Sequence, residues 1–317
     1  MAYDIAILGN SIVDYVVRTE KPLLDALGIK EGSSVPIMHD ERIGLERVIG
    51  KYERLSGGSE ANTAAAFANL GGNVAYVGAV GNDDNGKFFI KDLAQYGVSR
   101  CGKIKVMDGY TGVVINLVTG NDRTMRSDLE GSPALSADDI PKGVMRETPY
   151  FHTSAYVMLS MPSAFDRCMQ MAKYEKITVS FDLASAFVVE KNRGKVLDLV
   201  KNYVNVLFAN EEEAKALTGL EPEYAVAELG KMADIAVVKL GSKGSLVSYF
   251  EDRIVKIPPV PTTVVNTTGA GDSYAGAFLY GLLRCYDAEK CGEMASRYAS
   301  LVVAQENPRL DRDWRII

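Results

Sequence analysis

The feature that most restricts the fold of this chain is a regular alternation of strand-like and helix-like segments over residues 150–240. Short runs rich in β-branched and aromatic residues predict strands at 150–156, 177–182, 204–209 and 235–240. The segments between them have the apolar spacing of helices, at 162–175, 193–202 and 211–232. Strands and helices that alternate in this way form a mainly parallel sheet with helices on both faces. We therefore expect a three-layer α/β/α fold.

Length and composition agree with one large globular unit over residues 1–317. Of the 317 residues, 47% are hydrophobic and 24% charged, which is typical of folded globular proteins. The formal net charge of −6 provides no basic field for a nucleic-acid backbone, so we expect no nucleic-acid partner. The sequence has no apolar run long enough to span a bilayer, so we expect no membrane partner either.

The cysteines and the first residues predict a reducing, cytoplasmic location. The four cysteines show no C-x-x-C spacing and are accompanied by two histidines, which argues against a transition-metal site and for free thiols (Cys101, Cys168, Cys285 and Cys291). The apolar segment 4–9 is too short for a signal peptide and follows no basic run. We expect 4–9 to be a buried strand instead.

A second, smaller sheet is expected from the first half of the chain. Residues 12–56 mix short β-like pieces with charged segments, and 112–119 with 123–125 has the pattern of a hairpin. We expect parts of 12–50 and 104–127 to form this sheet discontinuously and to act as a lid that excludes water from a site on the body.

The loop 265–271 has the pattern of an anion-binding site. Gly269, Ala270 and Gly271 are small enough to let a phosphate reach their backbone N–H groups, and the apolar helix that follows points its positive end at the same place. Asp272 in the first helical turn would repel that anion. Either it accepts a proton from an attacking hydroxyl, or it caps the helix.

Other polar residues follow predicted strands or open predicted helices, and each has two interpretations. Asp14 either binds a polyol at the carboxyl edge of the sheet or forms a turn. Asn62, after Gly57 and Gly58, either offers hydrogen bonds to sugar hydroxyls or only begins a helix.

Asn210 and Glu213 share a helix face, so they either hold Mg²⁺ through water or are ordinary first-turn residues. Arg123 at the hairpin tip either covers transferring phosphates or is solvated. Gly241 and Gly244 would let an adenine or ribose lie against the backbone. The sequence has no P-loop and no dinucleotide-binding glycine fingerprint, and its histidines lack the context of a Ser-His-Asp hydrolase.

Several of these segments together resemble the ribokinase-like family of carbohydrate and nucleoside kinases, and most of all its adenosine kinase branch. Residues 266–272 are similar to the family signature D-T-x-G-A-G-D, residues 57–62 to G-G-x-x-x-N, and residues 210–213 to N-x-x-E. Residues 9–14, 119–123 and 208–214 are similar to adenosine kinases more than to ribokinases or fructokinases. The likeness extends over nearly the whole chain.

The resemblance implies a role for each matching residue. It implies a catalytic base at Asp272, with the anion hole and the lid arginine formed by Gly269, Ala270, Gly271 and Arg123. Acceptor-binding residues would be Asn10, Asp14, Gly58, Asn62 and Tyr156. ATP would contact Lys239, Gly241, Gly244, Asn210 and Thr267, and Asn210 with Glu213 would organise Mg²⁺ and its waters.

One position departs from the family pattern. Asn266 stands where relatives usually have an Asp that helps to bind an activating monovalent cation. A neutral amide attracts K⁺ less than a carboxylate does, so we expect weak or absent K⁺ activation.

The expected activity is therefore ATP- and Mg²⁺-dependent phosphorylation of the 5′-hydroxyl of a nucleoside, above all adenosine. The nucleobase of the substrate would lie against apolar or aromatic walls, for which the candidates are Ile37, Met38, Tyr156, Phe187 and Val188. A sugar kinase of the same fold acting on ribose or a ketohexose is the alternative, and a nucleoside-binding sensor with little catalysis is another. We expect a monomer or a homodimer.

Overall fold

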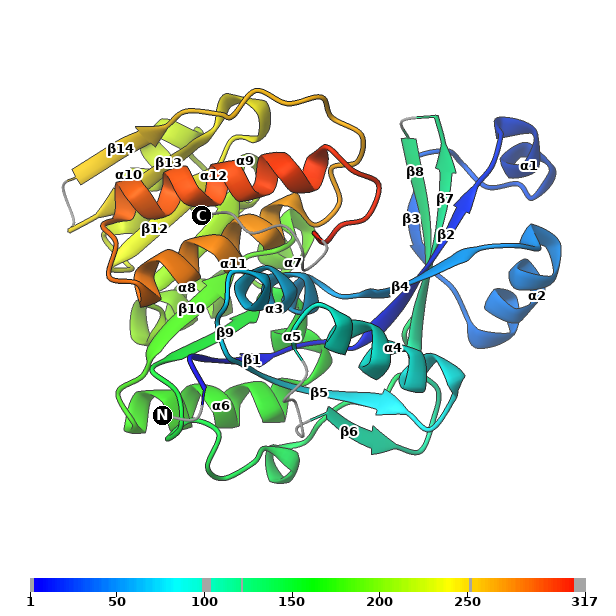
Figure 1. Cartoon of the computed structure of the whole chain (residues 1–317), viewed down its shortest axis with the longest axis horizontal. Coiled ribbons are helices and arrows are strands. Elements are labelled where there is room, and N and C mark those ends of the chain that lie inside the picture. The colour runs from blue at the N-terminus through cyan, green and yellow to red at the C-terminus, as the bar shows by residue number, and fades with distance from the viewer. Residues whose placement is uncertain (1–2, 99–103, 121, 251–252, 311–317) are drawn as a thin grey trace.

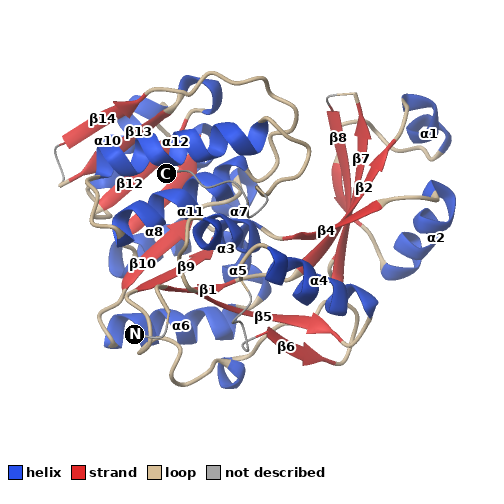
Figure 2. Cartoon of the chain, in the orientation of Figure 1, coloured by secondary structure: helices blue, strands red, loops and turns tan. Residues whose placement is uncertain are grey.

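The computed structural model describes residues 3–98, 104–120, 122–250 and 253–310. Within these ranges the chain forms a large α/β body and a small sheet that projects from one side of it (Figures 1 and 2). No helix among them is long and apolar enough to cross a membrane. Cys168, Cys285 and Cys291 are free thiols, while Cys101 lies outside the described residues.

The body is built on one large, mostly parallel sheet, which confirms the predicted fold class. In the described residues its strands, in spatial order, are β14 (Arg253–Ile257), β13 (Ser245–Tyr249), β12 (Ile235–Lys239), β11 (Val206–Asn210), β10 (Thr178–Asp182), β9 (Tyr150–Ser154), β1 (Ile5–Leu8), β5 (Val74–Gly81) and β6 (Ile104–Met107). Strand β13 is antiparallel to both neighbours, and the other pairs are parallel.

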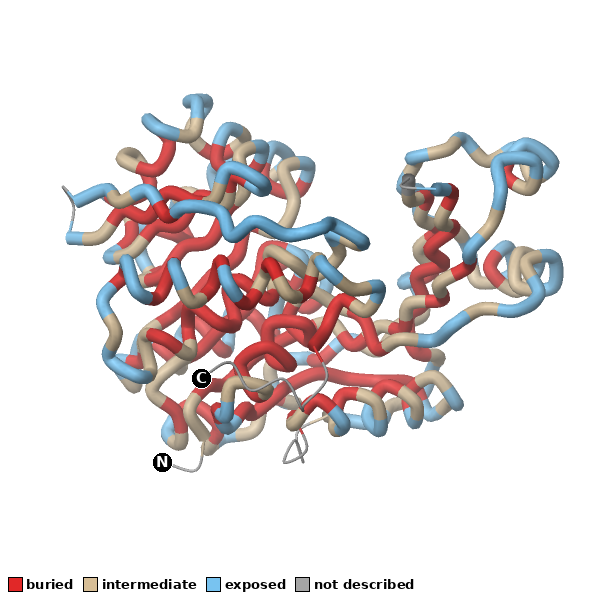
Figure 3. Tube along the Cα trace, turned by 45° about the horizontal axis from the view of Figure 1, so that its top comes forward, coloured by how far each residue is buried: buried red, intermediate tan, exposed pale blue. Residues whose placement is uncertain are grey.

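Helices cover both faces of this sheet. One face carries α3 (Ser59–Asn69), α4 (Asp84–Gln95), α11 (Ala270–Leu283) and α12 (Ala288–Val303). The other carries α5 (Ala155–Ser160), α6 (Pro162–Tyr174), α7 (Ala186–Lys191), α8 (Arg193–Tyr203), α9 (Glu211–Thr218) and α10 (Pro222–Gly230). Buried residues run through the strands of the body and the parts of the helices beside them (Figure 3). In β1, Ile5 and Ile7 belong to one core and Ala6 and Leu8 to the other, as side chains alternate along a strand.

Two short helices follow strands: α5 begins within the predicted strand 150–156, and α7 lies between the predicted strand 177–182 and helix 193–202, where no element was predicted. Strand β9 ends at Ser154, whose hydroxyl accepts a hydrogen bond from the Tyr156 N–H at 3.2 Å and so begins α5. Ser185 begins α7 in the same way, with its hydroxyl 3.4 Å from the Val188 N–H. Serine is a common N-cap residue, so Ser154 and Ser185 could have predicted these helices, but the alternation of strand and helix patterns does not use this signal. Tyr156 is therefore helical.

The second sheet is small and has its own helices. Its described strands, in spatial order, are β3 (Ser34–Pro36), β8 (Asp122–Asp128), β7 (Gly112–Thr119), β2 (Ile12–Arg18) and β4 (Glu53–Gly57), with α1 (Lys21–Ala26) and α2 (His39–Ile49) beside them. Of the range 104–127, parts of which were expected in this sheet, residues 104–107 pair with β5 at the edge of the large sheet. Asn121 of the predicted hairpin turn lies outside the described residues.

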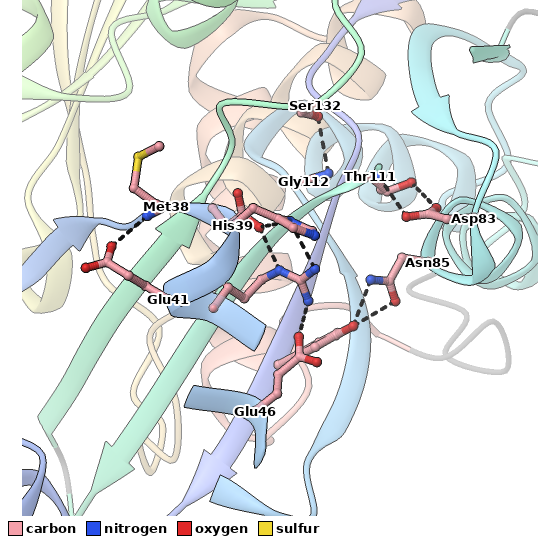
Figure 4. A network of polar contacts seen from close by, with 12 residues as sticks. Met38, His39, Glu41, Glu46, Asp83, Asn85, Thr111, Gly112 and Ser132 are labelled. Atoms are coloured by element: carbon pink, nitrogen blue, oxygen red, sulfur yellow. Dashed lines mark hydrogen bonds and ion pairs between the residues drawn. The ribbon is translucent and has the colours of Figure 1, made fainter. Parts of the chain in front are cut away.

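Polar contacts hold the small sheet against α4 of the body (Figure 4). The Tyr15 hydroxyl on β2 lies 3.0 Å from Oδ1 and 2.7 Å from Nδ2 of Asn85 in the first turn of α4. Asp83, which caps α4, accepts hydrogen bonds from the N–H and the hydroxyl of Thr111 at 2.9 and 2.7 Å. The two sheets are thus joined by more than the connecting chain.

Close packing of α3 against α11 brings two distant parts of the chain together. A Cβ at Gly276 would lie 2.5 Å from the Thr63 carbonyl oxygen and 2.8 Å from Cβ of Ala66. Only glycine permits this approach of the two helices. The first turns of α3 and α11 therefore meet beside the carboxyl ends of the parallel strands, where ligands bind in open α/β folds.

Candidate functional site

Asp272 lies in the first turn of α11, and its carboxylate points to α3. Its Oδ1 accepts a hydrogen bond from the Ser59 hydroxyl at 2.6 Å, and its Oδ2 accepts one from Nδ2 of Asn62 at 2.8 Å. Gly269 is the N-cap of α11, and no side-chain hydrogen bond caps the helix there. The helix-cap interpretation of Asp272 is therefore wrong, because the carboxylate is held by the neighbouring helix.

The start of α3 depends on glycine. Gly58 has φ 98°, and a Cβ there would lie 2.4 Å from the Asn10 carbonyl oxygen. Glycine at this position lets the chain turn sharply from β4 into α3. The first turn of α3 then presents Ser59 and Asn62 to Asp272, and the Thr63 hydroxyl donates to the Asp272 carbonyl oxygen at 3.1 Å.

Burial raises the pKa of Asp272, although the hydrogen bonds from Ser59 and Asn62 act in the opposite direction. Desolvation penalises the charged form of a carboxylate, whereas donors to that form stabilise it. A carboxylate whose affinity for a proton is increased in this way is suited to accept one from an alcohol.

The anion loop has part of the expected geometry. Gly269 adopts a left-handed conformation with φ 73°, and α11 begins at Ala270. The Ala270 N–H lies 3.3 Å from the Thr267 carbonyl oxygen, so this predicted anion-hole donor is already in a long hydrogen bond. The N–H groups of Gly271 and Asp272 are first-turn donors, for which a helix supplies no acceptor of its own. The Thr267 side chain is exposed.

Lys239 reaches the anion loop from the end of β12. A Cβ built on Gly271 would lie 3.3 Å from the Lys239 Nζ, so the absence of a side chain at Gly271 gives the ammonium access to the loop. The Nζ also forms an ion pair with Oδ2 of Asp182 at 2.8 Å. Burial lowers the pKa of Lys239, but Asp182 and Glu213 outweigh burial, and the net pKa is raised. The ammonium is thus kept charged beside the loop.

Asn210 and Glu213 are fully engaged with each other at the start of α9. Asn210 Oδ1 accepts the Glu213 N–H at 2.8 Å, and Glu213 Oε2 accepts the Asn210 N–H at 2.8 Å. Nδ2 of Asn210 donates to Oε1 of Glu213, also at 2.8 Å. This reciprocal pair is a capping box. Burial and then Asp182 raise the pKa of Glu213 to about 7.

These contacts fit Mg²⁺ held through water better than direct ligation. No group of three metal-ligating side chains is found among the described residues. Both carboxylate oxygens of Glu213 already accept a hydrogen bond, and each retains a second lone pair that a metal-bound water could use. Mg²⁺ typically keeps several waters and takes few protein ligands, so the pair remains a suitable outer-sphere site.

Asp14 lies within β2 and faces the body. Its Oδ1 accepts a hydrogen bond from Nδ2 of Asn116 at 3.0 Å, and a Cβ at Gly57 would lie 2.3 Å from its Oδ2. Burial raises the pKa of Asp14. The turn interpretation is wrong, because Asp14 is the third residue of a strand. Asp14 lies close enough to Asp272 for the two charges to interact.

Asn10 is built into the framework beside this region. Its Oδ1 accepts a hydrogen bond from the Ser160 hydroxyl at 2.7 Å, and its N–H donates to Glu60 at 3.2 Å. Tyr156 on α5 is 43% exposed, and its phenol hydrogen-bonds to Ser185. Its charge interactions with Asp272 and Glu60 place it beside the site.

The other residues proposed to line a nucleobase pocket differ in how far they are buried. Phe187 and Met38 are exposed, at 68% and 57%, whereas Val188 is buried in the core between the large sheet and its helices. Ile37 is partly buried on the small sheet side. Val188 is therefore unavailable as a wall.

Arg123 links the small sheet to the anion loop. One terminal nitrogen donates to the Thr268 hydroxyl, and the other donates to Oδ1 of Asn266 at 2.9 Å. The interpretation of Arg123 as a merely solvated turn residue is wrong. Asn266 in turn donates from Nδ2 to the Glu306 carbonyl oxygen at 2.6 Å. Arg123 and Asn266 thus form a second contact between the small sheet and the body, at the loop before α11.

Gly241 and Gly244 have different local roles. Gly244 has φ 92°, and a Cβ there would lie 2.1 Å from the Ile257 carbonyl oxygen, so glycine is required for packing. Gly241 has φ 56° and open space where a Cβ would point. Contact of either residue with ATP stays a prediction.

Sequence reasoning missed several residues that hold the site together. Ser59 and Thr63 contact Asp272, Asn116 holds Asp14, and Arg309 donates to Asn62. Glu60 is 1% exposed and accepts hydrogen bonds from the Ser154 hydroxyl and the Asn10 N–H. A charged residue in an alanine-rich helix is a detectable signal for Glu60. Arg309 follows the last helix and had no comparable signal.

Comparison with known proteins extends over most of the chain. Residues 41–315 match the family described as pfkB family carbohydrate kinase. The structure is similar to that of adenosine kinase from Sinorhizobium meliloti, with a TM-score of 0.87 and 30% identity over 98% of this chain and 96% of that one.

Two curated relatives are similar in sequence. An ATP-dependent ribose-1-phosphate kinase of Halopiger xanaduensis is 30% identical, covering 83% of this chain and 86% of that protein. A 5-dehydro-2-deoxygluconokinase of Clostridium perfringens is 27% identical, covering 81% and 80%. These likenesses confirm the resemblance inferred from the motifs.

The buried carboxyl of Glu60 predicts a pH-dependent contribution to stability. Burial raises its pKa from 4.5 to about 7, so between these values the folded state holds a proton that the unfolded state has lost. Stability should therefore fall as pH rises through this window. Glu60→Gln has no carboxyl to titrate, so its stability should not fall in this window. The difference in free energy of unfolding, variant minus wild type, should therefore be about 1–3 kcal/mol larger at roughly pH 8 than at roughly pH 4.5.

Urea denaturation at both pH values measures this difference. Glu53→Gln, at an exposed position on β4, is the matched control and should show no such change. An equal difference between Glu60→Gln and wild type at the two pH values would show that Glu60 titrates normally.

Proposed function

Because the chain belongs to the pfkB family of carbohydrate kinases and is an ATP-dependent kinase of sugars or nucleosides, we propose that its acceptor is a nucleoside, phosphorylated at the 5′-hydroxyl, with adenosine as the expected substrate. The observation that carries this choice is the exposed ring of Tyr156 on α5, which lies near enough to Asp272 for the two charges to interact, together with the exposed ring of Phe187 on α7, a helix that contacts α5. A nucleobase has a flat aromatic face that stacks on such rings more strongly than a small sugar does.

Asp272 is the proposed general base. The acceptor hydroxyl would lie against its carboxylate, which takes the proton as the phosphorus–oxygen bond forms. Asn62 donates one amide N–H to Asp272, and its second N–H remains available to an acceptor oxygen. Asp14, opposite on β2, would accept hydrogen bonds from ribose hydroxyls.

The phosphates of ATP are proposed to lie at the start of α11. The N–H groups of Gly271 and Asp272, the positive end of the helix and the Lys239 ammonium all face an anion at that place. Asn210 and Glu213 would hold the waters of Mg²⁺. When bound, Mg²⁺ supplies charge neutralisation on the transferring group.

The adenosine kinase of Sinorhizobium meliloti supports the nucleoside proposal, since its structure matches this chain at 30% identity. The curated relatives favour a second candidate, a sugar kinase, because their names are those of a ribose-1-phosphate kinase and a 5-dehydro-2-deoxygluconokinase. Tyr156 distinguishes the two, since loss of an aromatic wall should cost more for an acceptor that carries a nucleobase than for a sugar.

An acceptor panel tests the proposal directly. ADP release from ATP would be measured with adenosine, other nucleosides, ribose, ribose 1-phosphate, fructose and 5-dehydro-2-deoxygluconate. We expect adenosine to give the highest kcat/KM. Loss of a stacking ring typically costs roughly 1–3 kcal/mol, so Tyr156→Ala should raise KM for adenosine about 5- to 100-fold.

Tyr156→Phe keeps the ring and is the matched control, with an expected KM close to wild type. A sugar or sugar phosphate as the preferred acceptor, with Tyr156→Ala neutral, would establish the second candidate instead.

The proposed base predicts a large loss of turnover on its removal. Asp272→Asn keeps the size of the side chain but cannot accept the proton, so kcat should fall roughly 10²- to 10⁴-fold. ATP binding, measured by calorimetry, should persist. Asp198→Asn on the exposed face of α8 is the control for a lost carboxylate. Near-normal turnover of Asp272→Asn would contradict the mechanism.

Asn266 predicts independence from K⁺. Its Oδ1 accepts hydrogen bonds from Arg123 and the Thr268 N–H, and its Nδ2 donates to the Glu306 carbonyl oxygen. An amide N–H therefore occupies the direction in which a cation would require an oxygen. Replacing Na⁺ by K⁺ at fixed ionic strength should leave the rate unchanged, and Asn266→Asp should acquire K⁺ activation. A several-fold response of wild type would contradict this.

A further inference from the structure

Arg309 is a buried arginine that the proposed chemistry does not use. It lies in the turn after α12, is 3% exposed, and stacks over the ring of Tyr96 with its guanidinium carbon 5.3 Å from the ring centre. A buried guanidinium is costly unless it is paired and hydrogen-bonded. Its location therefore requires a structural or functional reason.

The guanidinium connects two elements of the site. Nε of Arg309 donates to Oδ1 of Asn62 at 2.8 Å, and one terminal nitrogen donates to the Ser56 hydroxyl and lies 3.9 Å from Oδ2 of Asp92. Ser56 donates its own N–H and hydroxyl to that Asp92 oxygen at 2.9 and 2.6 Å. Asp92 and Ser56 thus fix the arginine, and its Nε–H points at Asn62.

The contact with Arg309 determines which way the Asn62 amide faces. Arginine nitrogens only donate hydrogen bonds, so the atom of Asn62 that faces Nε must be the oxygen. The amide nitrogen then faces Oδ2 of Asp272, 2.8 Å away. In the opposite orientation, an N–H would meet a guanidinium N–H and the amide oxygen would meet a carboxylate. Both contacts would be repulsive.

We propose that Arg309 is a positioning residue that holds the Asn62 amide in the orientation that donates a hydrogen bond to the catalytic carboxylate of Asp272. The inference rests on the proposed function for its kinetic consequences and on geometry for its structural part. The turn that carries Arg309 is itself fixed, because the Pro308 carbonyl oxygen would lie 2.8 Å from a Cβ at Gly269.

Other charges act on Asp272 and define the background of the test. The groups whose charges interact with it are Asp182, Lys239, Asp14, Glu60, Glu213 and Tyr156. The substitutions below leave all of them in place. Arg309→Met also removes a charge that acts on Asp14, whereas Ser56→Ala keeps that charge, so the two variants together separate a change that passes through Asn62 from a general change of the local charge.

The test combines Arg309→Met with Asn62→Ala. A hydrogen bond to a charged group is typically worth 1.5–3 kcal/mol, so Arg309→Met should lower kcat roughly 10- to 100-fold, with a smaller change in the acceptor KM. Loss of the Asn62 donor should move the acid limb of the kcat profile to higher pH by about one unit. In the Asn62→Ala background, Arg309→Met should change kcat less than about twofold.

A second readout does not depend on turnover. The Asp272 carboxyl carbon, labelled with ¹³C and assigned by difference from Asp272→Asn, should titrate at higher pH in Arg309→Met than in wild type. Ser56→Ala removes one hydrogen-bond partner of Arg309 and should shift the Asp272 titration in the same direction, by a smaller amount. This variant replaces Arg309→Met in the test if Arg309→Met does not fold. Arg297→Met on the exposed face of α12 is the control and should titrate like wild type.

The outcomes separate cleanly. An unchanged Asp272 titration in the folded variants, or an equal loss of kcat from Arg309→Met with and without Asn62, would overturn the positioning role. A wild type that releases no ADP with any acceptor would contradict the proposed function, while the titration would still decide the role of Arg309.

Discussion

The contact between the first turns of α3 and α11 is the constraint on which the rest of the site depends. The Asn62 and Asp272 side chains meet although 210 residues separate them along the chain. Gly276 allows the backbones to approach, with the Thr63 carbonyl where its Cβ would otherwise lie. Two helix N-termini are thereby held against one carboxylate, and their partial positive charges favour an anion in the same place.

This arrangement places several acidic side chains where an anionic phosphate is expected to bind. Their burial raises their pKa values and so reduces the repulsion between these acids and the phosphate. Asp14, Glu213 and Asp272 all have raised pKa values, with burial as the largest cause. A phosphate that enters would raise the pKa of Asp272 further and so strengthen this carboxylate as an acceptor for the hydroxyl proton. Lys239 stays charged because its acidic neighbours outweigh its burial. The site can therefore hold a phosphate beside a proton acceptor.

The sequence predicted the features that depend on local pattern and missed those that depend on tertiary contact. The alternation of strand and helix patterns over residues 150–240 predicted the large sheet. The small residues at 269–271 predicted a loop that leads into a helix, and α11 begins there. Residues 104–107 joined the large sheet because β5 offered an edge, which no local pattern reveals. The roles of Asn210 and Glu213 were left open for a related reason. A capping box and a water-mediated metal site use the same spacing, and the structure shows the first while leaving lone pairs for the second.

The turn after α12 explains how the proton acceptor and the anion loop stay in register. Glu306 accepts a hydrogen bond from Asn266, Pro308 packs on Gly269, and Arg309 donates to Asn62. Three residues of one short turn thus contact the loop before α11, the N-cap residue of α11 and the residue that holds Asp272. Arg123 of the small sheet binds the same Asn266, so a movement of that sheet toward or away from the body acts on this turn as well. Asp272, the anion loop and the small sheet are therefore mechanically coupled through this turn and through Asn62, Arg123 and Asn266.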